Sequence, residues 1–343
     1  MKVLQQLRKL LARRGVRALL LLPLGIGLLY LAFRQVELEA LASSLWQASY
    51  WPVIAAMGVG LLAHFLRALR WQIQLEDIGG RVSLFETFYA VMLGYTVNLV
   101  LPRAGELARC GQIAAAQQLP LDRTIGSMVG ERLSDLIMSV LLLGVVIGAS
   151  YDYFGAFVLQ ATQAKLSELD GTHLLKYALI GAVAIVALGI LIIRLVGRQM
   201  RNRLRAISTG LLAGIRTLWR SSHRMYYLLY TLLIWFCYWL MTYLVCLALP
   251  ETAALPVMSS LLLLVAGTLG MIVPVQGGIG SFHMAVALWL EVEGLSRAEG
   301  LAYATLSHGA QMLLVLLLAL VLLCVRTVIR TRSQRKTMQE TMA

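Results

Sequence analysis

The stretch NLVLPRAGELAR, residues 98–109, interrupts an apolar segment that runs from residue 84 to residue 119. Proline lacks a backbone N–H and glycine tolerates unusual backbone angles, so both break a membrane helix. A second apolar segment, residues 256–291, is interrupted in the same way by Pro274, Gly277, Gly278 and Gly280. These two broken segments, set among uninterrupted ones, decide the fold that we expect.

The composition is typical of a membrane protein. Hydrophobic residues make up 59% of the 343 residues and charged residues only 14%, against about 25% charged in soluble domains. A bilayer core of about 30 Å requires about 20 apolar residues per helix. Six uninterrupted segments approach or exceed that length: 16–33, 52–67, 124–150, 174–196, 225–249 and 300–325.

The net charge of +13 does not indicate nucleic-acid binding, because the basic residues gather at the ends of apolar segments. That distribution is the membrane pattern, in which Lys and Arg mark cytoplasmic loops. The N-terminal arm, residues 197–224 and the tail 326–343 are rich in Lys and Arg, so we expect them and both termini in the cytoplasm. Residues 34–50 and 151–173 carry few basic side chains and are expected outside.

This orientation makes both broken segments re-entrant. Residues 84–119 must begin and end on the cytoplasmic side, and residues 256–291 on the outer side. Irregular backbone at membrane depth is tolerated where it packs on protein or lines a wet cavity. We therefore expect two helical hairpins that enter the membrane from opposite faces.

The two hairpins also align with each other, since Pro102 and Gly105 match Pro274 and Gly277 at an offset of 172 residues. The predicted fold is an all-α polytopic membrane protein with six transmembrane helices and two opposed re-entrant helical hairpins in an inverted repeat. It is one membrane domain, residues 1–343, with halves 1–150 and 174–325 and the basic tail 326–343. Inverted repeats with broken helices are the architecture of secondary transporters.

The first charged cluster lies at the tip of the first hairpin. If the returning arm is helical, Glu106 and Arg109 share a face, and the helix that opens at Gly105 offers free N–H groups to an anion. Arg103 beside it suits a phosphate. The alternative is that these charges belong to a solvated cytoplasmic loop.

The second cluster comprises Glu131, Arg132 and Asp135, early in the span 124–150. Ionisable groups so close within a membrane must pair with one another or with a partner such as Arg103 or Arg109. A structural lock between hairpin and span and a substrate site are both open interpretations.

The second hairpin carries Gln276, three glycines and His283. The glycines let backbone approach a ligand closely. His283 is expected near His308 and Gln311 of the last span, either as a hydrogen-bonded structural residue or as a proton-coupling group.

A further cluster lies at the cytoplasmic end of the span 52–67 and contains His64, Arg67, Arg70 and Trp71. Arginine with tryptophan at such a place favours an interface anchor over a head-group guide. No P-loop, HExxH, GxSxG or dinucleotide motif occurs. The four cysteines, Cys110, Cys237, Cys246 and Cys324, show no metal or disulfide spacing. We expect no catalytic residues, metal or cofactor.

Three motifs, in this order and spacing, resemble the lysylphosphatidylglycerol synthetase transmembrane-region family: N-x-x-x-P-R-x-G-E-x-x-R from Asn98, E-R-x-x-D from Glu131 and P-x-x-G-G-x-G from Pro274. This is the flippase-like domain of multiple peptide resistance factor proteins, also found as stand-alone proteins, and the resemblance covers nearly the whole chain. It implies a bacterial or archaeal plasma (inner) membrane and a role in moving lipids. Gln276 and His283 depart from the proline and glutamate of many members. The chain ends soon after its last span, so the aminoacyl-transfer domain and lysyl transfer are not expected.

The function predicted is therefore translocation of an anionic or polar-headed lipid, phospho- or polyprenyl-linked, by a protein that is not an enzyme. The expected partners are membrane lipids, bound by an anionic head group, with no nucleic acid and with a homodimer left open. The rival interpretations are an intramembrane lipid-modifying enzyme, and a non-transporting scaffold for a lipid or glycan synthase. The candidate substrate-binding residues are Asn98, Arg103, Gly105, Glu106, Arg109, Glu131, Arg132, Asp135, Gln276, Gly277, Gly278, Gly280 and His283.

Overall fold

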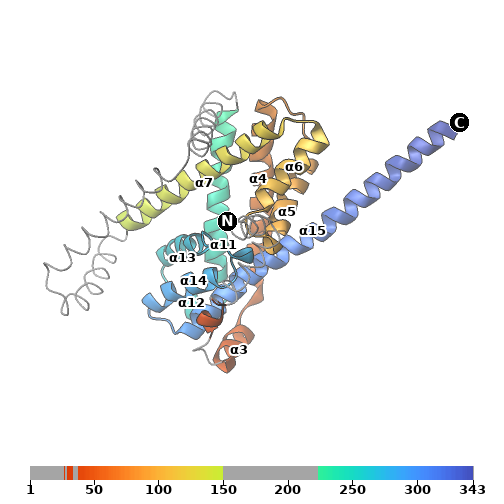
Figure 1. Cartoon of the computed structure of the whole chain (residues 1–343). Coiled ribbons are helices and arrows are strands. Elements are labelled where there is room, and N and C mark those ends of the chain that lie inside the picture. The colour runs from red at the N-terminus through yellow and green to blue at the C-terminus, as the bar shows by residue number, and fades with distance from the viewer. Residues whose placement is uncertain (1–26, 28, 34–37, 150–222, 343) are drawn as a thin grey trace, which may run out of the picture. The chain divides into compact units, whose positions relative to one another are not determined.

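The computed structural model describes residues 27, 29–33, 38–149 and 223–342 (Figure 1). These residues form helices with short connections, and no strand occurs among them. The chain separates into two compact units, residues 1–139 with 220–343, and residues 140–219. All contacts below lie within the first unit. The expected span 174–196, most of the span 16–33 and the connections 151–173 and 197–222 lie outside the described residues.

Among the described residues, three helices are long and apolar enough to cross a membrane, which confirms a membrane-protein architecture. They are α4 (Tyr50–Asp77), α11 (Arg224–Cys246) and the part of α15 (Arg297–Met342) up to Val328. They coincide with the expected segments 52–67, 225–249 and 300–325. Helix α7 (Leu121–Ala149) covers residues 124–149 of the expected segment 124–150.

Helices α4 and α11 pack side by side along an apolar seam (Figure 1). Ala63 and Leu66 of α4 meet Ile234 and Cys237 of α11. At one end of the pair, Ser49 donates its N–H to the carbonyl oxygen of Ala248, 2.7 Å away. The short helices α3 (Leu38–Gln47) and α12 (Pro250–Ala253) flank this end.

Both broken segments form helical hairpins. Helix α5 (Leu84–Val100) packs on α6 (Gly105–Gln117), and α13 (Val257–Gly270) packs on α14 (Ser281–Val292). The second turn contains the 3-10 helix η1 (Gln276–Gly278). Each arm is shorter than the ~20 residues that a bilayer crossing requires. The helices are interrupted at the proline and glycine residues, between Val100 and Gly105 and between Gly270 and Ser281.

Glycine brings the arms of each hairpin together. A Cβ at Gly105 would overlap the carbonyl oxygen of Gly94, and a Cβ at Gly270 would lie 2.8 Å from the carbonyl oxygen of Ser281. The side chain of Asn98 fixes the first turn, since its Oδ1 accepts a hydrogen bond of 2.8 Å from the N–H of Gly105. In each hairpin the backbones of the two arms therefore approach each other at a distance that only glycine permits.

Candidate functional site: a crevice between the hairpin tips

The tips of the two hairpins touch. Arg103, in the left-handed region at φ 59°, donates from Nη2 to the carbonyl oxygen of Ile272 at 2.6 Å. Leu99 of α5 lies against the backbone of Gly277 in η1. Two broken helices that face each other are expected from the aligned Pro-x-x-Gly motifs, and the contact joins residues 169 positions apart in sequence.

A cavity of about 390 Å³ lies between these tips, and we call it the tip crevice. Its volume is within the range of small-molecule and head-group sites. Both tips line it, together with side chains from α4, α7 and α15. The polar lining consists of His64, Tyr95, Asn98, Arg103, Glu106, Arg132, His308 and Gln311.

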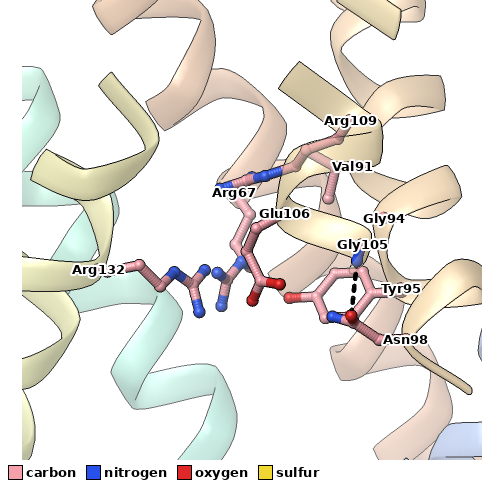
Figure 2. A pocket seen from close by; sticks show the side chains of 9 residues that line it. All are labelled: Arg67, Val91, Gly94, Tyr95, Asn98, Gly105, Glu106, Arg109 and Arg132. Carbon is pink, nitrogen blue, oxygen red and sulfur yellow. Dashed lines mark hydrogen bonds between the residues drawn. The ribbon is translucent and has the colours of Figure 1, made fainter. Parts of the chain in front are cut away.

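A smaller recess of about 30 Å³, room for about one water molecule, shares part of this lining (Figure 2). Tyr95, Asn98, Glu106 and Arg132 line both spaces, and Arg67 and Arg109 line only the recess. The recess thus connects the tip crevice to a buried network of charges.

Glu131 of α7 is the centre of that network and is fully buried. Its Oε1 lies 2.7 Å from Arg67 Nη2, 2.9 Å from Arg132 Nη2 and 3.3 Å from Arg70 Nη2. Its Oε2 lies 2.9 Å from Arg109 Nη2. A carboxylate with four guanidinium partners is held in place from three helices, because α4, α6 and α7 each contribute arginine.

Asp135, one turn further along α7, is the second acid of the network. Its Oδ1 lies 2.8 Å from Arg70 Nη2, and its Oδ2 lies 3.5 Å from both Arg67 and Arg132. Four guanidinium groups therefore face two carboxylates, an excess of two positive charges; three of the arginines are buried, and the side chain of Arg132 is 43% exposed. Buried charge of one sign is costly unless a counter-ion is supplied, so this network favours an anion nearby.

The interpretation of Arg67, Arg70 and Trp71 as interface anchors is wrong. Arg67 is 6% exposed, and Arg70 and Trp71 are completely buried. Arg67 also donates to Tyr238 of α11 at 2.6 Å, and Arg70 donates to Thr231 at 3.2 Å. The partners that bury this end of α4 come from α7 and α11, which are distant in sequence, so the flank of the segment alone does not show the burial.

Two of the three expected partners of Glu131, Arg109 and Arg132, do bind it, whereas Arg103 bonds to Ile272 instead. Arg109 also lies over the ring of Trp71, 4.5 Å from its centroid. The N–H of Gly105, expected to face an anion, is taken by Asn98. Asn98 and Gly105 therefore shape the turn that carries Arg103 and Glu106, and Figure 2 shows the hydrogen bond between Asn98 and Gly105.

The family model for the lysylphosphatidylglycerol synthase TM region matches residues 16–319. The chain belongs to this family. It is also 27% identical over 199 residues to the glycosyltransferase AglD of Haloferax volcanii, and the match covers 56% of this chain. The chain spans about a third of that relative's length, since the match covers 31% of it. No solved structure matches the chain.

The predicted site residues of the second hairpin lie in two environments, inside and outside the lining of the tip crevice. Gly277 and Gly278 line the tip crevice, at φ 57° and 77°. Gln276, Gly280 and His283 do not line it. His283 is buried with its ring centroid 5.3 Å from that of His308, so the expected neighbourhood of these two histidines is observed.

His283 belongs to a separate lateral cavity of about 540 Å³, lined mainly by apolar side chains such as Phe33 and Ile279. His308 lines both this cavity and the tip crevice. In the part of the chain that the structure describes, no group of three or more His, Cys, Asp or Glu side chains converges as metal ligands would.

Proposed function

We propose that this protein moves lipids with an anionic head group across the membrane, and that the head group occupies the tip crevice. The observation that carries the proposal is the junction of two broken-helix tips over a buried excess of arginine. Broken helices whose tips face a common site are the way in which secondary transporters build binding sites. The family's lysylphosphatidylglycerol synthase name supports a lipid setting for the chain.

The proposal includes the topology expected from the sequence, with six spans and two hairpins that re-enter from opposite faces. The short arms of α5, α6, α13 and α14 support it, because none reaches the ~20 residues of a full crossing. A site at the junction of such hairpins would be reachable from each side in turn.

The arginines divide into two roles. Arg103 and Arg132 line the tip crevice and would contact the phosphate, since a guanidinium offers paired donors to phosphate oxygens. Arg67, Arg70 and Arg109 are buried behind them and bind Glu131 or Asp135. These three act as positioning residues that hold the acids and supply positive potential.

A second candidate is a non-transporting membrane partner for lipid-linked glycan synthesis. The 27% identity to a protein named as a glycosyltransferase favours it. The two candidates differ in one observable, because a transporter changes the sidedness of a lipid by itself and a scaffold does not.

The test is reconstitution of the full chain into phosphatidylcholine vesicles that contain a fluorescent phosphatidylglycerol. A membrane-impermeant reductant bleaches the outer leaflet, and the protein should make the inner-leaflet fluorophore accessible. We expect Arg132→Ala to slow this at least about tenfold, and the exposed Tyr226→Phe of α11 to leave it unchanged. Unaltered sidedness with wild-type protein would favour the scaffold, and a chemically altered lipid would favour an intramembrane enzyme.

A further inference from the structure

Several buried polar atoms belong to side chains that line the tip crevice and have no hydrogen-bond partner among the described residues. They are Nδ1 and Nε2 of His64, Oε2 of Glu106 and Nδ1 of His308. His64 is 8% exposed and His308 is 7% exposed. Buried polar groups in proteins are almost always paired, so these atoms indicate what a ligand must supply.

Phosphate cannot satisfy this set. Phosphate oxygens accept hydrogen bonds, and the orphaned carboxylate oxygen of Glu106 accepts as well. An ammonium only donates, so it would leave an imidazole N–H of His64 unpaired. A hydroxyl both donates and accepts, and it therefore matches either nitrogen of an imidazole and the carboxylate.

The charge around Glu106 also disfavours an amine. Figure 2 shows the Glu106 carboxylate facing the guanidinium groups of Arg67 and Arg132. The crevice and the network behind it together contain five arginines and three acids, when Arg103 and Glu106 are included. An ammonium group brought here would meet an environment that is already positive.

We propose that the head group is a phosphate ester that carries neutral hydroxyl groups, such as glycerol or a sugar, and that the tip crevice rejects head groups that carry an amine. This inference rests on the proposed function, and it names the substrate class of the same site. Arg103 and Arg132 take the phosphate. His64, Glu106 and His308 take the hydroxyls.

The experiment measures lipid binding to the purified full chain in phosphatidylcholine nanodiscs by native mass spectrometry. The central comparison is phosphatidylglycerol against phosphatidylmethanol, which has the same charge and no hydroxyls. We expect about a tenfold preference for phosphatidylglycerol, the gain from one or two hydrogen bonds. Phosphatidylethanolamine and lysylphosphatidylglycerol should bind at least about tenfold more weakly than phosphatidylglycerol.

A further arm replaces phosphatidylglycerol with a polyprenyl-phosphate hexose. Both lipids carry a phosphate ester and neutral hydroxyl groups. The lipid that binds more tightly shows whether glycerol or a sugar supplies the hydroxyl groups that the crevice recognises. Equal binding of phosphatidylglycerol and phosphatidylmethanol would overturn the inference. So would binding of either amine-bearing lipid as tight as that of phosphatidylglycerol.

Two substitutions connect the preference to these residues. Glu106→Gln keeps the shape of the side chain, and His64→Phe removes both orphaned nitrogens. Each should lower the phosphatidylglycerol preference to about twofold or less while phosphatidylmethanol remains bound. The matched control is His223→Phe, the same exchange at an exposed residue before α11. A preference that survives both crevice substitutions would contradict the assignment, and Glu106→Gln decides it if His64→Phe fails to fold.

The vesicle assay separates this inference from transport. Selective binding without movement of lipid would retain the hydroxyl site and refute translocation. Movement of all anionic lipids at one rate, with no preference in binding, would retain translocation and refute the hydroxyl site.

Discussion

Arg67 Nη2 and Glu131 Oε1 lie 2.7 Å apart, with side-chain exposures of 7% and 0%. The pair joins α4 to α7 inside the protein and lies behind the tip crevice. Glu131 also binds three other arginines, so its carboxylate is the shared counter-ion of the whole network.

Removal of Glu131 should therefore be strongly destabilising. Glu131→Ala leaves buried guanidinium groups without their acid, and breaking a buried ion pair in this way costs ~3–5 kcal/mol. Thermal unfolding of the purified protein should show the loss. The matched control is Glu291→Ala, whose partner Arg297 lies 3.3 Å away in a pair that is about a quarter to a third exposed. Exposed pairs contribute only ~0–1 kcal/mol.

Loss of Arg109 as well should restore part of that stability. Arg109 binds Glu131 and no other acid in the described residues, so Glu131→Ala with Arg109→Met removes a charge of each sign. We expect the double variant to unfold at a higher temperature than Glu131→Ala alone. Additive losses in the double variant would show that the two side chains do not share one interaction.

Because α5 and α6 approach each other closely, replacing two glycines of α6 by alanine should change the stability of the protein in opposite directions. Gly105→Ala should destabilise the hairpin, because its Cβ would overlap the carbonyl oxygen of Gly94. Gly111→Ala meets no atom within 4 Å and should stabilise α6 by up to ~1 kcal/mol through helix propensity. Thermal unfolding distinguishes them, and equal effects of the two substitutions would contradict the tight turn.

The re-entrant topology predicts sidedness at the ends of both hairpins. In a background without the exposed Cys324, single cysteines at Arg81 and Asp122 should react with an impermeant thiol reagent from the cytoplasmic side. Cysteines at Ala253 and Glu293 should react from outside. Labelling of positions 81 and 122 from opposite sides would mean that α5 and α6 together cross the membrane, and it would rule out the inverted repeat.

The positions of both hairpins could be predicted from the sequence because their cause is local. Proline and glycine act on the backbone where they stand, and the helices end at Val100 and at Gly270 beside these residues. The second turn is longer than the aligned motifs suggested, since α14 begins only at Ser281. Three positive φ values, at Gly277, Gly278 and Gly280, extend it, with Ile279 between them at φ −62°.

The ion network could be predicted only in part. The pairing of Glu131 with Arg109 was expected because both lie in recognisable charged motifs. The sequence predicts Arg67 and Arg70 at the membrane surface, since nothing in α4 alone shows that α7 covers them. Such burial depends on how helices far apart in sequence pack, and hydropathy along one segment carries no information about that.

Substitution of Arg103 tests the head-group site at the hairpin tips most directly. Arg103 is exposed, lines the tip crevice and has a hydrogen bond to Ile272. The measurement is the rate of phosphatidylglycerol movement in vesicles at equal protein content. Arg103→Lys keeps the charge but loses the planar fork that grips phosphate, so we expect about a fivefold decrease. Arg103→Ala should lose at least about tenfold, with the unfolding temperature retained in both. Arg123→Ala, an exposed arginine near the start of α7, should move lipid as wild type does. Wild-type rates in both Arg103 variants would contradict a head-group site at the hairpin tips. They would favour the alternative that the charges of the first tip belong to a solvated loop.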